Sequence, residues 1–277
     1  MTSKQFRHAI VLLCAVLAVG LLLYAMGVFS PRRTADGSIS QRDERVLTVA
    51  AAADLTSAMG EVVDAFRRQH GDIKVRVGFG SSGNFFAQLV NHAPFDMFLS
   101  ADTDYPRRLI EEKLALEESK FTYALGRIVL WAPPNSSLDM KQASAQTLLD
   151  PSLRKIAIAN PRYAPYGRAA EAALRKLGVY DQIKDKLAFG DNVAQTAQFI
   201  QSRAADIGII SRSQALALGA ADRFWEIPQS AYPRIEQGGV ILTWAKDLKA
   251  AEAFRAFLIG KDGQAILLRH GFSSPGD

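Results

Sequence analysis

Apolar runs and helical segments alternate from about residue 46 to the end of the chain. Runs such as VLTVAAA, KIAIAN and DIGIIS are apolar almost without interruption, which is typical of strands buried on both faces of a sheet. The segments between them carry apolar residues at helical spacing, as Leu55, Met59, Val62 and Phe66 do in the first. This order predicts an α/β protein whose mainly parallel sheets are flanked by helices.

Charge and composition exclude a nucleic-acid partner. The chain has 277 residues, of which 48% are hydrophobic and 22% charged, as in an ordinary globular protein. Much of the net charge of +5 lies near the N-terminus, where Lys4, Arg7, Arg32 and Arg33 face only Asp36. The remainder is close to balance and has no basic run with interleaved aromatic residues, so we expect no nucleic-acid surface.

The N-terminal segment predicts export. A short basic stretch, MTSKQFRH, precedes an apolar run at residues 9–29 that has about the length of a membrane-spanning helix. Residues 1–29 are therefore an export signal that is either cleaved or kept as an inner-membrane anchor, and residues 30–45 are a flexible linker. The basic residues place the body outside the cytoplasm, in the periplasm. The body has no cysteine, because Cys14 lies in the apolar run, so we expect no disulfide.

Four segments, here called corners, join an apolar strand or loop to the start of a helix through small or neutral polar residues. They are AADLT at 52–56, GSSGN at 80–84, APYGR at 164–168 and GDNVA at 190–194. Helix starts carry unpaired N–H groups and partial positive charge, so several of them directed at one point would bind an anion. Each corner taken alone is also an ordinary cap or turn. Their place at the carboxyl ends of parallel strands favours a shared ligand site.

The motifs around these corners resemble the molybdate-binding proteins, the periplasmic receptors of molybdate ABC transporters. The resemblance runs from about Val46 to Phe272 and is carried by VAAAADLTSAM, GFGSSGNFFAQLVNHAPFDMFLSAD, YALGRIVLWAP, IAIANPRYAPYGRAAEAAL, DNVAQTAQFI, ADIGIIS and GGVIL. It implies a two-lobed periplasmic-binding-protein fold of type II, with the ligand cleft between the lobes. Lobe one would comprise residues 46–125 and 232–277, and lobe two residues 126–231.

The resemblance also implies a set of ligand-binding residues. Ser82 matches the serine of the second corner, and Tyr166 and Val193 match positions that bind through the backbone N–H. The hydroxyl group of Ser81 is a further candidate donor beside Ser82. Molybdenum would be present only within the bound oxyanion, molybdate or tungstate, with no protein ligand on the metal and no cofactor.

Two positions depart from the family pattern, and Asp54 and Ser211 are candidate site residues for that reason. Members of the family often have serine where this chain has Asp54, and some have tyrosine where it has Ser211. Molybdate carries two negative charges, and a carboxylate about 4 Å away would repel each by roughly 4 kcal/mol at an effective dielectric constant of about 20.

Three arrangements would relieve this repulsion. Asp54 caps its own helix by accepting from the N–H of Thr56 or Ser57, or its carboxyl group is protonated, or the ligand carries a proton that Asp54 accepts. The third is known in phosphate-binding proteins of this general fold. We favour the helix cap, because Asp is a good N-cap residue.

The leading hypothesis is an extracytoplasmic binding protein that captures molybdate or tungstate and delivers it to the membrane permease of an ABC transporter. The alternative is a receptor for another tetrahedral oxyanion, such as phosphate. An enzyme is not expected, because the sequence has no nucleophile motif, no nucleotide-binding loop and no histidine spacing typical of a metal site. We expect a monomer.

Overall fold

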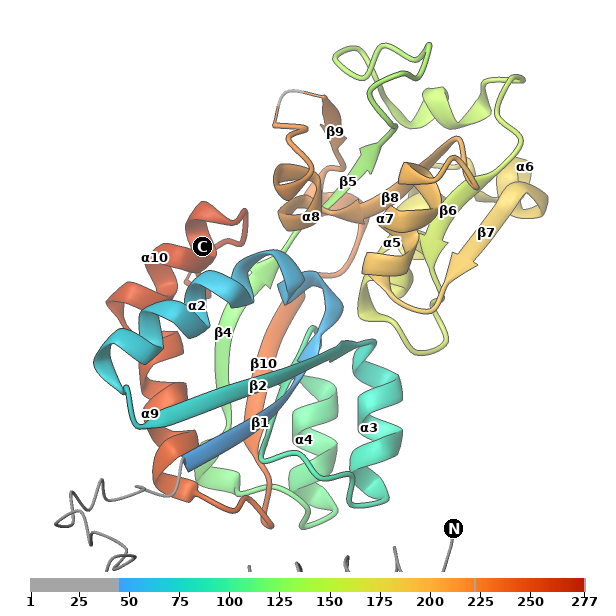
Figure 1. Cartoon of the computed structure of the whole chain (residues 1–277). Coiled ribbons are helices and arrows are strands. Elements are labelled where there is room, and N and C mark those ends of the chain that lie inside the picture. The colour runs from blue at the N-terminus through green and yellow to red at the C-terminus, as the bar shows by residue number, and fades with distance from the viewer. Residues whose placement is uncertain (1–44, 222, 277) are drawn as a thin grey trace, which may run out of the picture. The chain divides into compact units, whose positions relative to one another are not determined.

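The computed structural model describes residues 45–221 and 223–276, and its strands form two five-stranded sheets (Figure 1). The predicted export signal, and the predicted linker apart from its last residue, lie outside the described residues. No helix in the described part has the length and apolar character needed to cross a membrane.

The first sheet has the strand order β2-β1-β3-β10-β4. Its strands are β1 (Arg45–Ala52), β2 (Ile73–Gly80), β3 (Met97–Ser100), β4 (Phe121–Gly126) and β10 (Ile235–Ile241). β1 pairs with β2 in parallel along its whole length, so that Ala52 lies opposite Gly80. The two strands therefore end at the same position along the sheet, and the first and second corners begin side by side.

The second sheet repeats this arrangement with the order β7-β6-β8-β5-β9. Its strands are β5 (Ile128–Trp131), β6 (Ile156–Ala159), β7 (Leu187–Gly190), β8 (Ile207–Ser211) and β9 (Phe224–Glu226). Ala159 at the end of β6 lies opposite Gly190 at the end of β7. The third and fourth corners are thus also neighbours.

Each sheet is mixed, because four strands run in one direction and one is reversed. β10 pairs antiparallel with both β3 and β4 in the first sheet, and β5 pairs antiparallel with both β8 and β9 in the second. The reversed strand is in each case the one that the chain enters directly from the other sheet. The chain leaves the first sheet through Arg127, between β4 and β5, and returns between β9 and β10.

Helices cover both faces of each sheet and supply its core. On the first sheet, α2 (Thr56–Gln69), α9 (Leu248–Ile259) and α10 (Lys261–Arg269) lie on one face, and α3 (Ser82–Val90) and α4 (Asp104–Glu111) on the other (Figure 1). Phe66 and Phe254 meet edge to face in this core, with ring centroids 5.1 Å apart. Full burial of such a side chain contributes roughly 1.5–3 kcal/mol.

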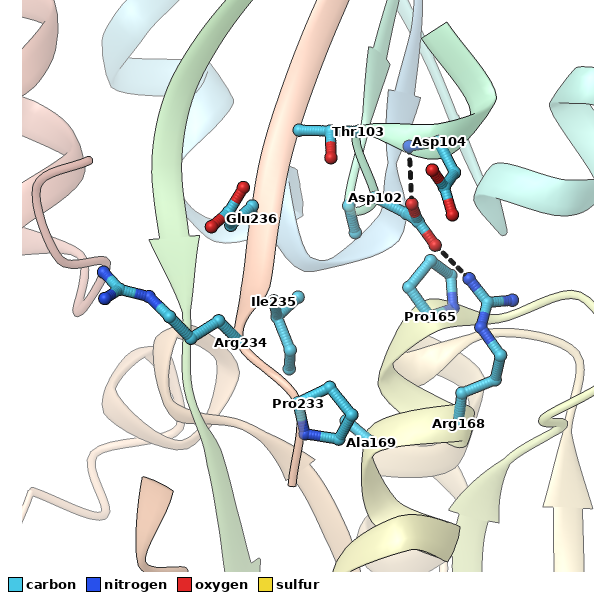
Figure 2. Close-up of a pocket in the computed structure, with 11 residues that line it drawn as sticks. Asp102, Thr103, Asp104, Pro165, Arg168, Ala169, Pro233, Arg234, Ile235 and Glu236 are labelled. Carbon is cyan, nitrogen blue, oxygen red and sulfur yellow. Dashed lines mark hydrogen bonds and ion pairs between the residues drawn. The ribbon is translucent and has the colours of Figure 1, made fainter. Parts of the chain in front are cut away.

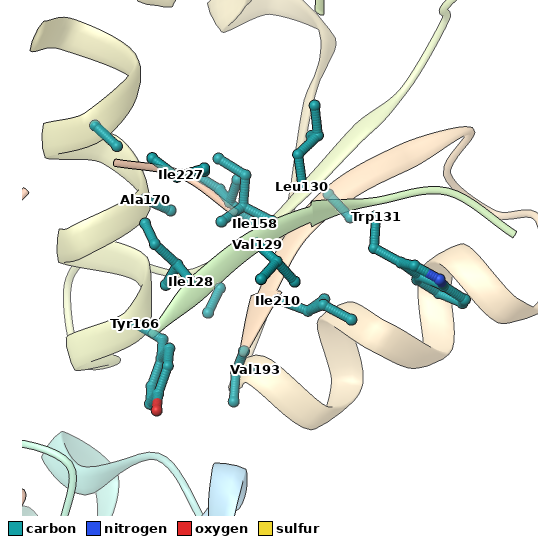
Figure 3. Packing of buried hydrophobic residues seen from close by; sticks show 14 of the residues in the cluster. Ile128, Val129, Leu130, Trp131, Ile158, Tyr166, Ala170, Val193, Ile210 and Ile227 are labelled. Atoms are coloured by element: carbon teal, nitrogen blue, oxygen red, sulfur yellow. The ribbon is translucent and has the colours of Figure 1, made fainter. Parts of the chain in front are cut away.

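The second sheet carries α5 (Pro165–Lys176), α6 (Tyr180–Ile183), α7 (Val193–Gln201) and α8 (Arg212–Ala217). Its core contains fully buried residues of β5 and β6, among them Ile128, Leu130 and Ile158. Figure 3 shows Tyr166 and Val193 at the edge of this core, with the phenol oxygen of Tyr166 pointing away from it. The core therefore fixes the starts of α5 and α7, which belong to the third and fourth corners.

Candidate anion-binding site

All four corners line one small cavity, here called the inner cavity. The lining residues are Ala52, Ala53, Asp54, Gly80, Ser81, Ser82, Ala101, Ala164, Pro165, Tyr166, Asn192 and Val193. The first two corners come from the lobe built on the first sheet, and the other two from the lobe built on the second. The volume is about 10 Å³, close to the room that one water molecule needs. An anion with four oxygen atoms is larger, so it can enter only if the lobes move apart.

The second corner contributes two hydroxyl groups, both buried. Ser81 caps α3, and its Oγ accepts a hydrogen bond from the N–H of Asn84 at 3.4 Å. The Oγ of Ser82 accepts from the N–H of Ala101 at 3.0 Å. Because each oxygen is used as an acceptor in these bonds, each hydroxyl hydrogen remains for another partner. Both serines can therefore donate into the cavity.

The third corner contributes a backbone N–H group at the start of α5. Pro165, the first helical residue, has no N–H, and the N–H groups of Gly167 and Arg168 donate to the carbonyl of Ala164 at 2.9 and 3.1 Å. The N–H of Tyr166 lies in the first turn, where a helix offers no acceptor of its own. It is the donor that this helix start leaves for a ligand.

The fourth corner also leaves one backbone N–H group available at a helix start, but no proline is involved. The Oδ1 atom of Asn192 accepts from the N–H groups of Ala194 and Gln195, both at 3.0 Å. The side-chain cap therefore uses the second and third N–H groups of α7 and leaves that of Val193, the first helical residue. A helix start of this kind favours an anion through its partial positive charge.

Asp54 lies in a short 3-10 helix, Ala53–Leu55, and is fully buried. Its Oδ2 accepts from the hydroxyl of Tyr166 at 2.9 Å and from the side-chain amide of Gln237. The favoured prediction of a helix cap is wrong, because α2 begins after Leu55 without any side-chain cap. Two buried donors from other parts of the chain occupy Oδ2 instead, whereas Oδ1 has no hydrogen-bond partner.

Burial dominates the electrostatics of this carboxyl group. It raises the pKa of Asp54 to about 6, although the hydrogen bonds from Gln237 and Tyr166 act in the opposite direction. Burial, together with the charge of Asp54, also raises the pKa of Tyr166 and Tyr123 well above the usual value. Both phenols therefore remain neutral hydrogen-bond donors at physiological pH.

Gln237 is a site residue that the sequence motifs did not single out. It is fully buried on β10, where the pairing with β4 shifts register between Gln237 and Gly238. Its Oε1 accepts from the hydroxyl of Tyr123 at 2.9 Å, and its amide donates to Asp54 and, at 3.0 Å, to the hydroxyl of Tyr166. The apolar run that follows it, GGVIL, was the available sign of a buried strand.

Ser211 is not among the residues that line the inner cavity. It caps α8, where its Oγ accepts from the N–H of Gln214 at 3.2 Å and lies 2.9 Å from the Oγ of Ser213. Ser213 in turn donates to the backbone carbonyl of Asp54 at 3.1 Å. Ser211 therefore stabilises the first corner indirectly, through Ser213, and does not line the cavity with the other five candidate residues.

The two lobes also contact each other around the cavity. The N–H of Gly83 donates to the carbonyl of Tyr163 at 2.9 Å, and the guanidinium group of Arg168 binds Asp102 and, at 3.3 Å, the hydroxyl of Tyr105. Figure 2 shows the pair of Arg168 and Asp102 at a groove between the lobes. This outer groove has a volume of about 320 Å³ and shares Ala101 and Pro165 with the inner cavity. These contacts hold the lobes together over the site.

Arg168→Ala is expected to weaken anion binding by up to about fivefold, because a partly exposed ion pair contributes about 0.2–1 kcal/mol. The pair spans the lobes, so its loss disfavours only the closed arrangement. The matched control is Arg175→Ala, since Arg175 pairs with Glu171 within α5 at 2.7 Å. Titration calorimetry of both variants checks this, and equal affinities in the two would contradict it.

Comparison with known proteins matches most of the chain to one family. The family model described as bacterial extracellular solute-binding protein matches residues 47–273. The molybdate-binding protein ModA of Azotobacter vinelandii is 36% identical over 226 residues, which cover 81% of this chain and 88% of that protein. ModA of Rhodobacter capsulatus is 35% identical over 80% of this chain and 86% of its own length.

A solved structure shows the same architecture. The periplasmic molybdate-binding protein of Azotobacter vinelandii superimposes with a TM-score of 0.75 at 32% identity, covering 83% of this chain and 99% of that one. The predicted two-lobed α/β fold, with helices on both faces of each sheet, is therefore confirmed.

Proposed function

The chain belongs to the family of bacterial extracellular solute-binding proteins, and we propose from this that it is the molybdate-binding component of an ABC transporter. It captures molybdate or tungstate between its lobes on the extracytoplasmic side and delivers the anion to the transporter. The molybdate-binding relatives, similar over about four fifths of the chain, support this ligand.

The observation that carries the proposal is that uncharged hydrogen-bond donors, not used in bonds within the described chain, come together at one cavity. The hydroxyl groups of Ser81 and Ser82 come from one lobe, and the N–H groups of Tyr166 and Val193 come from the other. Such donors can hold a dianion without a neighbouring cation when they lie at helix N-termini and are shielded from water. We propose these four as the direct ligands, with Asp54 beside them and Ser211 as a support of the first corner.

Titration calorimetry against molybdate, tungstate, sulfate and phosphate tests the proposal. Molybdate and tungstate have nearly equal radii and are expected to bind with similar, high affinity. Sulfate is smaller and leaves donors out of reach, so each lost hydrogen bond to the charged ligand weakens binding by about 10- to 150-fold. Tighter binding of sulfate or phosphate than of molybdate would overturn the assignment.

Phosphate is the second candidate ligand because of one observation, the buried Oδ1 of Asp54 that has no donor. Monohydrogen phosphate carries a hydrogen that this oxygen can accept. In that case Asp54→Asn would abolish phosphate binding, because an amide donor would face the hydrogen of the ligand. If molybdate is the ligand, the same substitution improves binding.

The remaining assignments are part of the same proposal. The lobes comprise residues 46–125 with 232–277 and residues 126–231, which move about the connections near Arg127 and between β9 and β10. The direct partner is the membrane permease of the transporter, the protein acts as a monomer without nucleic acid, and residues 9–29 serve as its export signal or inner-membrane anchor. A molecular mass in solution and the N-terminus of the mature chain test the last two assignments.

A further inference from the structure

We propose that Asp54 takes up one proton from solvent when a dianionic oxyanion that carries no hydrogen, such as molybdate, binds, so that its carboxyl group donates a hydrogen bond to the anion. This inference rests on the proposed function and adds a proton to the binding reaction. Asp54 thereby determines specificity, because it distinguishes an anion that brings no hydrogen from one that does.

The two oxygen atoms of Asp54 differ in a way that fixes where the proton goes. Oδ2 already accepts from Tyr166 and Gln237, so it is held as an acceptor. Oδ1 is buried and has no partner, in a residue that lines the inner cavity. A proton on Oδ1 would satisfy the only unpaired oxygen of the carboxyl group and could be donated to an oxygen of the anion.

No cation in the described part of the chain is placed to neutralise this carboxylate. α7 has no charged residue, and Arg212 at the start of α8 faces Glu226 at 3.6 Å. On α5, Arg168 pairs with Asp102. The charged side chains of α2 and β2, and Glu236 on β10, are exposed.

The groups that do face Asp54 are neutral. They are the phenols of Tyr166 on α5 and Tyr123 on β4, the amide of Gln237 on β10, and the backbone N–H groups of Asp54 and Leu55. An ionised Asp54 would therefore meet a dianion in a buried site with no cation to offset the repulsion, which raises the proton affinity of the carboxyl group. Burial already raises the pKa of Asp54 to about 6, and the approach of a dianion acts in the same direction, so the carboxyl group is protonated in the complex at neutral pH.

The test is calorimetry of the full-length chain with molybdate at about pH 7.5, in buffers of different ionisation heats, which counts the protons taken up. We expect about one proton per molybdate and a Kd that rises about tenfold per pH unit between about pH 7 and pH 8.5. Monohydrogen phosphate brings its own hydrogen, so any weak binding of it should proceed without this uptake.

Asp54→Asn supplies the decisive comparison, because it keeps an acceptor for Tyr166 and Gln237 and replaces Oδ1 with a permanent N–H donor. The variant should take up no proton, bind with little pH dependence, and bind molybdate about thirtyfold more tightly than the parent at about pH 7.5, since protonation at a pKa of about 6 is no longer required. Asp262→Asn, at an exposed carboxylate on α10, is the matched control and should retain the uptake.

The outcomes separate the two proposals. Molybdate binding without proton uptake by the parent chain overturns the inference and leaves the proposed function intact, and this result does not depend on any variant. Uptake that persists in Asp54→Asn assigns the proton to another group and also overturns it. Absence of molybdate binding at every pH overturns both.

Discussion

Gly83→Ala is expected to weaken molybdate binding by about a hundredfold, the upper range for forcing an extra methyl group into a close contact. A Cβ atom at Gly83 would lie 2.6 Å from the carbonyl oxygen and 2.8 Å from the Cα of Tyr163. The Cβ would also lie 2.7 Å from the hydroxyl of Tyr105, but this is the end of a side chain in the same lobe and can move aside. The backbone atoms of Tyr163 belong to the other lobe, so the contact that cannot relax exists only when the lobes are together. Titration calorimetry measures the loss in affinity, and thermal unfolding of the ligand-free chain shows whether the fold is kept.

The ligand-free variant should be at least as stable as the parent. Gly83 is the second residue of α3, and alanine favours a helix over glycine by roughly 0.5–1 kcal/mol. Gly60→Ala in α2 is the matched control, because a Cβ atom there meets nothing within 4 Å. It should stabilise the chain in the same way without changing affinity, and unchanged binding by Gly83→Ala would show that closure does not require this contact.

Val193→Pro is expected to weaken molybdate binding by about 10- to 150-fold through the loss of one backbone hydrogen bond to a charged ligand. Proline is well tolerated at the first helical residue, which Val193 occupies in α7. Asn192 before it has φ −152° and ψ 175°, the extended conformation that a residue preceding proline prefers. The substitution thus removes one N–H group while preserving the helix start, and calorimetry of the variant measures the effect.

The control for this change is Val193→Ala, which shortens the buried side chain but keeps the N–H group. It should lose some stability from the smaller side chain and retain most of its affinity. Equal losses of affinity in the two variants would mean that packing of the side chain, rather than the backbone donor, governs binding at this corner.

The fold was largely predictable from local pattern. Continuous apolar strands alternating with helical segments fix the α/β class, and corners that follow strands must gather at one edge of each sheet. The level ends of β1 with β2, and of β6 with β7, bring the corners together in pairs. Ser81, Ser82, Tyr166 and Val193 all line the cavity for this reason.

The environment of Asp54 was not predictable, because it depends on contacts that span the sequence. Its donors Tyr166 and Gln237 are 112 and 183 residues away, and no local signal relates them. A good N-cap residue before a helix predicts a cap, yet the two buried donors need an acceptor and occupy its oxygen instead. Ser211 does not line the cavity, because its hydroxyl oxygen caps α8 and contacts Ser213.

The level strand ends have a consequence for how such a receptor can vary. Each sheet holds its two corners in a fixed relation, so the donors of one lobe cannot move individually to fit a different anion. The position of one lobe relative to the other can still change. It is set by a few residues where the chain crosses between the lobes and by residues on the surfaces where the lobes meet, such as Gly83. Changes of anion preference should therefore arise more readily from the hinge and the facing surfaces than from the donors themselves.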